Sequence, residues 1–139
     1  MRDVDDRTTT GTDEAGRPSR SLRPALEVHD LGTEGVGLLG EPQWSDGDRN
    51  SKTLLKTESL RVVLTALRAG ATMENDDPDE AVAIHGLQGS LAIGVDDGEV
   101  TVAAGQLVCL AGGDPWRLTA TTDSLFLLSL GRARTSTVE

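Results

Sequence analysis

The chain has 139 residues and carries 13 Lys and Arg against 23 Asp and Glu, a formal net charge of −10. An acidic domain of this size repels phosphate backbones and anionic lipid surfaces, so we expect neither a nucleic acid nor a membrane as its partner. No apolar run approaches the roughly 18 residues that a membrane-spanning helix requires, and the N-terminus lacks the apolar region of a secretory signal. We therefore expect a soluble, cytoplasmic protein.

The sequence holds one cysteine, Cys109, and two histidines, His29 and His85. A single cysteine cannot form a disulfide within the chain, and two histidines leave little for a metal site. Cys109 stands in the apolar run LVCL, where we expect a buried small side chain and not a nucleophile.

Composition divides the chain into three parts. Residues 1–24 contain mainly Thr, Asp, Arg, Gly, Ser and Pro, and such a segment cannot bury enough apolar surface to offset its ordering entropy. We expect a disordered N-terminal tail there and a second short tail over residues 132–139. Residues 25–131 are long enough to form a single domain with a modest core.

The predicted elements of this domain begin with short strands. Residues 25–31 alternate weakly, as a strand would, and residues 41–56 contain the one candidate for a helical turn. Residues 59–70 are aliphatic and β-branched on both faces, which indicates a strand.

A long extended run follows at residues 80–95. Gly86 and Gly89 interrupt this run and predict bends or bulges. The next segment contains Asp97-Gly98, a strong signal for a hairpin turn, because a type I′ turn needs positive φ at both central residues.

The last third of the domain also reads as strands. Residues 104–116 form a strand that ends in a Gly-Gly-Asp-Pro turn, and Trp116, Leu118 and Ala120 then alternate on one face. Residues 124–130 are a last buried strand. Many short strands with regular turn signals predict an all-β antiparallel sandwich or barrel.

Two pairs of glycines carry a resemblance to a known family. Gly70 and Gly89 are spaced like the outer glycines of the first cupin motif, and Gly105 and Gly113 like the glycines of the second. Residues 40–130 therefore resemble the small single-barrel members of the cupin superfamily. The resemblance implies an all-β jelly-roll or β-barrel fold, and it implies a homodimer, because cupins often pair.

The positions of the cupin metal ligands hold other residue types in this sequence. Metal-binding cupins use two histidines and a carboxylate from the first motif and a histidine from the second, and those positions are Asp76, Pro78, Val82 and Trp116 here. Pro and Val side chains offer no lone pair, and an indole offers only an N–H donor. Since a transition metal needs at least about three protein ligands, we expect no metal and no cofactor.

Side chains at the ligand positions of a cupin point into the barrel, so Val82 and Trp116 should point inward too. Two interpretations stay open. In one, Trp116 is a core residue that closes a lost metal site. In the other, Asp76, Val82 and Trp116 line a reduced pocket with an aromatic floor and one carboxylate, suited to a small amine or a neutral ligand.

Two further features have plain structural explanations. The segment from Glu74 to Glu80 holds five carboxylates but lacks the spacing of an EF-hand loop, so we expect a solvated acidic loop. His85 lies on the opposite face from Val82 and Ile84 by the two-residue period of a strand, and we expect it outside the cavity.

The sequence supports two functional hypotheses from different classes. We favour a non-metal cupin-like barrel that binds a small molecule or serves as a scaffold, without catalysis. The alternative is a metal-independent isomerase or lyase that uses Asp76 or Glu74 as general base. No partner acid or oxyanion donor accompanies these carboxylates, which weighs against the enzyme.

Overall fold

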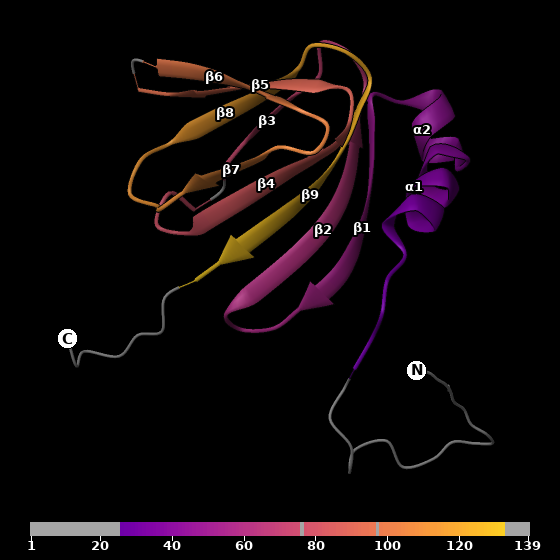
Figure 1. Cartoon of the computed structure of the whole chain (residues 1–139), viewed down its shortest axis with the longest axis horizontal. Coiled ribbons are helices and arrows are strands. Elements are labelled where there is room, and N and C mark those ends of the chain that lie inside the picture. The colour runs from indigo at the N-terminus through magenta and orange to yellow at the C-terminus, as the bar shows by residue number, and fades with distance from the viewer. Residues whose placement is uncertain (1–25, 76, 97, 133–139) are drawn as a thin grey trace.

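The computed structural model describes residues 26–75, 77–96 and 98–132. Within them, two short helices precede nine strands that form two antiparallel sheets (Figure 1). The elements are α1 (Leu31–Leu39), α2 (Pro42–Asp46), β1 (Arg49–Lys56), β2 (Leu60–Leu67), β3 (Thr72–Glu74), β4 (Ala81–Gln88), β5 (Ser90–Val95), β6 (Gly98–Ala103), β7 (Leu107–Leu110), β8 (Trp116–Ala120) and β9 (Ser124–Gly131). Apart from Arg132, the two predicted tails lie outside the described residues.

The strands are ordered β1-β2-β9-β4-β7 in the larger sheet and β3-β8-β5-β6 in the smaller one. The prediction of an all-β antiparallel fold is confirmed. β2 and β9 stand at the centre of the larger sheet, and β2 pairs with β9 from Leu60↔Gly131 to Leu67↔Ser124. Their aliphatic character on both faces has a simple cause, because one face packs on the other sheet and the opposite face packs under the helices.

The main core lies between the two sheets. Its fully buried side chains come from both of them: Leu67, Ile84, Leu91, Ile93, Leu118 and Phe126. Burial of each such side chain stabilises the fold by roughly 1.5–3 kcal/mol relative to exposure. The predicted alternation of Trp116, Leu118 and Ala120 on one face of β8 is confirmed, since all three are buried in this core.

A second, smaller core covers the outer face of the larger sheet. Leu38 of α1 and Trp44 of α2 pack against Leu64, Ala66 and Leu125, and Figure 1 shows both helices on the β1 side of the molecule. α1 approaches the sheet closely, because a methyl group at position 35 would lie 2.6 Å from the Leu125 side chain. Neither described helix is long and apolar enough to cross a membrane.

The expected strand at residues 25–31 is wrong. Residues 26–30 have no regular structure, and α1 begins at Leu31 with Asp30 as its N-cap, whose carboxylate accepts a hydrogen bond from the Thr33 amide at 3.1 Å. The α1 sequence LGTEGVGLL contains three glycines, and each disfavours a helix interior by about 1 kcal/mol. Packing of Leu38 in the second core offsets that weak local propensity.

The long run at residues 80–95 divides into β4 and β5 at Gly89. Gly89 has φ +81°, and a Cβ there would lie 2.4 Å from the Asp123 carbonyl oxygen, so this turn admits only glycine. The pairing of β4 with β9 shifts register between Gly86 and Gln88, at the predicted bend.

Two local predictions need correction. Val95 pairs with Gly98, so Gly98 begins β6 and the turn lies one residue earlier than expected, with Asp96 at φ +38°; Asp97 lies outside the described residues. Cys109 is exposed and not buried. It lies on β7, an edge strand, where Val108 and Leu110 face the core and Cys109 faces away from it.

Candidate functional site

A partly enclosed cavity of about 240 Å³ lies between the two sheets. The larger sheet contributes β1, β2 and β9 to its wall, and the smaller sheet contributes β3 and β8. On β1, Ser51 and Thr53 alternate with Lys52 and Leu54, which face the helices. The short hydroxyl side chains of β1 fill less space than the aliphatic side chains deeper in the barrel, and the cavity occupies the remaining volume.

One wall of the cavity is apolar. It consists of Val63, Met73, Trp116, Leu128 and Leu130. Trp116 is 5% exposed, and Asn75 fixes its backbone through two hydrogen bonds: the Trp116 amide donates to Asn75 Oδ1 at 3.1 Å, and the Asn75 amide donates to the Trp116 carbonyl at 3.4 Å. These bonds hold the Trp116 backbone beside Asn75, and the buried indole forms part of the apolar wall.

Thr65 is the unusual polar group of the cavity. Its side chain is 4% exposed, yet its hydroxyl has no hydrogen-bond partner among the described residues. An unpaired buried hydroxyl costs roughly 1–3 kcal/mol. By contrast, Asn50 is satisfied, because its amide donates to the Leu38 carbonyl at 2.9 Å and to the Glu41 carboxylate at 3.0 Å.

Four charged side chains line the cavity: Arg49, Arg61, Glu74 and Glu80. Three of them have a partner of opposite charge. Arg49 contacts Asp48 at 2.9 Å, Glu74 contacts Arg117 at 3.8 Å, and Glu80 contacts Arg132 at 3.5 Å.

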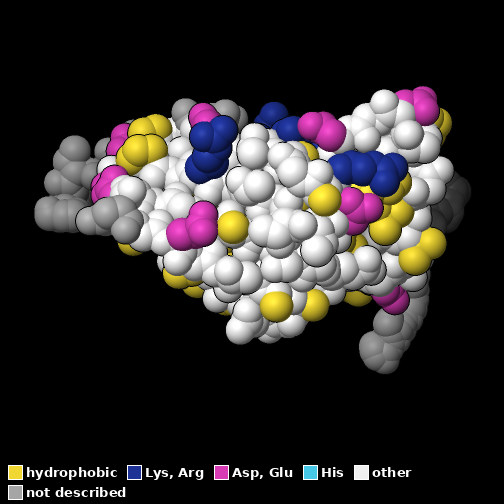
Figure 2. Space-filling model, turned by 90° about the horizontal axis from the view of Figure 1, so that it is seen from above, with side chains coloured by type: hydrophobic (Ala, Val, Ile, Leu, Met, Phe, Trp, Pro, Cys, Tyr) yellow, Lys and Arg dark blue, Asp and Glu magenta, His cyan; other side chains and the backbone are white. Residues whose placement is uncertain are grey.

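Arg61 forms no ion pair with any described residue, although it lies partly buried at this cavity. Elsewhere on the surface, acidic and basic side chains lie next to one another, as the face in Figure 2 shows. Arg61 is thus the charged side chain of the cavity wall whose donors no described carboxylate occupies.

Of the three residues predicted from sequence to line a pocket, the structure places one in the cavity wall. Trp116 lines the cavity, whereas Val82 is 3% exposed within the main core and does not reach the cavity wall. Asp76 lies outside the described residues. His85 is half-buried on β4, directly before the register shift at Gly86. It does not line the cavity.

Sequence reasoning missed Arg61 and Thr65. The signal was present in the β2 sequence LRVVLTAL, where Arg61, Val63, Thr65 and Leu67 share one face and the other face is entirely apolar. The two polar residues on one face of this otherwise aliphatic strand were the signal that this face borders a cavity.

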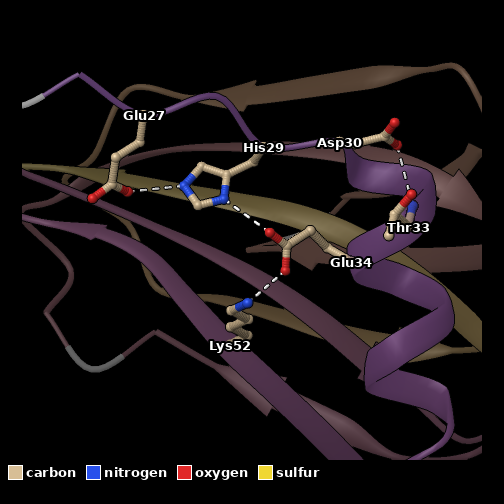
Figure 3. Close-up of polar contacts among 6 residues, drawn as sticks. All are labelled: Glu27, His29, Asp30, Thr33, Glu34 and Lys52. Carbon is tan, nitrogen blue, oxygen red and sulfur yellow. Dashed lines mark hydrogen bonds and ion pairs between the residues drawn. The ribbon is translucent and has the colours of Figure 1, made fainter. Parts of the chain in front are cut away.

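A second polar cluster lies outside the barrel (Figure 3). The His29 ring contacts two carboxylates, Glu34 at 3.0 Å and Glu27 at 3.1 Å, and Lys52 of β1 donates to Glu34 at 2.6 Å. The hydrogen bond to Glu34 raises the pKa of His29, and the same bond, with help from Lys52, lowers the pKa of Glu34. This cluster connects the segment before α1 to the sheet, and none of its residues lines the cavity between the sheets.

Comparison with solved structures shows which known fold this arrangement of strands matches. A conserved protein of unknown function from Streptococcus pyogenes superposes with a TM-score of 0.64 at 24% identity, over 81% of this chain and 93% of that one. A cupin superfamily protein from Desulfitobacterium hafniense superposes with a TM-score of 0.57 at 15% identity, over 88% and 94% of the two chains. The chain has the cupin fold.

A cupin domain of an XRE family transcriptional regulator from Enterobacter cloacae is also similar, with a TM-score of 0.56 at 18% identity, over 63% of this chain and 99% of that one. No protein-family model matches the sequence, and no curated protein matches it. The expected resemblance to cupins is therefore confirmed at the level of the fold.

The metal that many cupins carry does not fit the residues of this barrel. Val82 and Trp116, at two of the ligand positions, are buried side chains without a lone pair to donate. Pro78, at a third, is exposed and equally unable to bind a metal. Among the described residues there is no group of three or more His, Cys, Asp or Glu that could hold a metal ion.

Proposed function

We propose that this cupin is a metal-free binding module that takes one small molecule into the cavity between its sheets, without catalysis. The observation that carries the proposal is the cavity of about 240 Å³, whose wall includes Thr65, a buried residue with an unpartnered hydroxyl. The hydroxyl oxygen has almost no accessible surface, so a bound molecule would partner it after rotation of the Thr65 side chain about χ1.

The volume sets the size class of the molecule. Liquid water occupies about 30 Å³ per molecule, so the cavity has room for about eight waters or a small organic compound of similar volume. The five apolar side chains of its wall favour a compound with an apolar body, and the polar groups would orient it.

A general base in the cavity has little support. Glu74 is exposed, and its carboxylate contacts the Arg117 guanidinium at 3.8 Å, so it lacks the dry setting that favours proton abstraction. Glu80 is more enclosed, but its carboxylate contacts Arg132. The environment of both carboxylates supports binding without chemistry.

A native mass spectrum tests the proposal. The freshly purified protein should show an added organic mass, or should gain one after incubation with a panel of small anionic, neutral and cationic compounds. The matched variant Val63→Phe places an aromatic ring in the cavity wall and should show no added mass while it folds normally. A bare protein mass after every incubation would refute the proposal, and the same spectrum gives the protomer number, which we propose to be two.

A further inference from the structure

The charged side chains of the cavity wall indicate whether its ligand is an anion, a cation or a neutral molecule. Glu74, Glu80 and Arg49 each have a partner of opposite sign, and each partner is a residue that does not line the cavity. The described charge without an ion pair is the cation Arg61. The charged side chains of the wall balance, two arginines against two glutamates, and Arg61 is the one that a ligand can pair with without displacing a described ion pair.

Arg61 and the unpartnered Thr65 lie on the same face of β2, with Val63 between them. Four residues of a strand span about 13 Å between Cα atoms. Arg61 is the more exposed of the two and Thr65 is 4% exposed, so the cation lies toward the mouth and the hydroxyl lies at depth. The wall between them is apolar, with Val63, Met73 and Trp116.

We propose that the ligand is a small organic carboxylate with a second hydrogen-bonding group, such as a hydroxyl, at its other end. The carboxylate binds the Arg61 guanidinium, whose donors match two carboxylate oxygens. The hydroxyl binds Thr65 Oγ1 once rotation about χ1 turns this buried oxygen toward the cavity, and the carbon chain packs on Trp116. This inference rests on the proposed function and names the ligand class for the same cavity. It differs from the amine or neutral ligand that Asp76 suggested in the sequence.

Isothermal titration with three series of matched length tests the class. The series are ω-hydroxy carboxylates from hydroxybutanoate to hydroxyoctanoate, the corresponding carboxamides, and the corresponding ω-amino alcohols. The wild-type protein should bind its best carboxylate about 10- to 100-fold more tightly than the matched carboxamide, since a hydrogen bond to a charged group accounts for a difference of that size. The amino alcohols should bind more weakly still.

Three variants assign the interactions to residues. Arg61→Gln should reduce carboxylate affinity about 10- to 100-fold and leave carboxamide affinity nearly unchanged. Lys52→Gln is the matched control, because it removes a cation of β1 that faces the helices and does not line the cavity, and it should change carboxylate affinity by less than about threefold. Thr65→Val should weaken ω-hydroxy carboxylates toward the affinity of the acids that lack the hydroxyl.

The outcomes separate this inference from the proposed function. Equal affinity for carboxylates and carboxamides, or tighter binding of the amino alcohols, would overturn the assignment of the ligand class and leave the cavity as a binding site. An unchanged carboxylate affinity in Arg61→Gln would overturn the role of Arg61. Failure of all three series to bind, in a protein whose native mass spectrum is bare after every incubation, would overturn both proposals.

Discussion

The Thr65 hydroxyl lies on a central strand and is enclosed by the barrel without a partner among the described residues. In a protein without ligand, such a group lowers stability, because it gives up hydrogen bonds to water and gains none. Selection for stability alone would favour valine, which has nearly the same shape and a higher preference for strands.

Thr65→Val should leave the free energy of unfolding unchanged or raise it by about 1 kcal/mol. Urea denaturation of the wild type and the variant, both without ligand, measures this difference. A loss of more than about 1 kcal/mol would show that Thr65 makes a stabilising hydrogen bond in the free protein, which would remove the main support for the cavity as a site.

Gly89 is a residue whose identity the backbone conformation dictates. Its positive φ would strain any other residue, and a Cβ would also meet the Asp123 carbonyl oxygen and the Ser124 hydroxyl, both at 2.4 Å. Gly105 has a similar φ of +87° but open space around it. A substitution at Gly105 therefore introduces backbone strain alone, whereas a substitution at Gly89 introduces both backbone strain and steric overlap.

Gly89→Ala should lower the free energy of unfolding by at least about 2 kcal/mol, whereas Gly105→Ala should lower it by about 1 kcal/mol. Thermal or urea unfolding of both variants compares the two effects under the same conditions. Equal losses would mean that the close approach of Asp123 and Ser124 to position 89 is relieved at no energetic cost.

At the scale of elements, the His29 cluster joins the segment before α1 to the helix and to β1 (Figure 3). Both ring nitrogens of His29 face carboxylates, which only accept, so the imidazolium form satisfies both contacts. The pKa of His29 is raised in the folded protein. Its stabilising contribution is therefore present below the unfolded value of about 6.5 and is lost as the pH rises through the folded pKa.

His29→Gln should consequently lower the free energy of unfolding more at about pH 5.5 than at about pH 8.5. Glu34, whose pKa is lowered, stays ionised at both values, so the difference between them reports on His29. Urea unfolding of the two proteins at each pH gives the comparison. A loss that does not depend on pH would show that the His29 contacts contribute through the neutral ring.

The elements also show which parts of the fold the sequence could predict. β2, β8 and β9 were predictable because their aliphatic and alternating patterns reflect burial between sheets or under helices. α1 was not, because its three glycines weaken every local helix signal and the packing that stabilises it involves distant strands. β1 was missed for a related reason: most of its side chains are exposed or line the cavity, so it carries no apolar pattern.

The candidate site was predictable only in part. Alternation placed Trp116 inside the barrel, and the spacing of the cupin motif marked its position. The positions of Arg61 and Thr65 at the cavity could not be predicted, because β2 has the sequence of an aliphatic strand. Whether they line the cavity depends on which face of β2 turns toward β3 and β8. The packing of the two sheets determines which face of β2 turns inward, and the sequence of one strand does not specify that packing.

For the whole molecule, the central claim is that the cavity binds a small molecule, and emission from Trp116 tests it most directly. The sequence has two tryptophans, and Trp44 does not line the cavity but lies in the second core, with the Arg68 guanidinium 4.1 Å from its ring centre. A Trp44→Phe variant keeps an aromatic ring there and leaves Trp116 as the single indole.

Titration of the Trp44→Phe variant with the ω-hydroxy carboxylates should change the intensity or wavelength of Trp116 emission saturably. The same titration of Trp116→Phe, which retains Trp44, should give no change, and adding Val63→Phe to the Trp44→Phe variant should abolish the response. A Trp116 emission that stays constant with every anionic, neutral and cationic compound, or that changes equally when Val63→Phe fills the cavity, would contradict the claim.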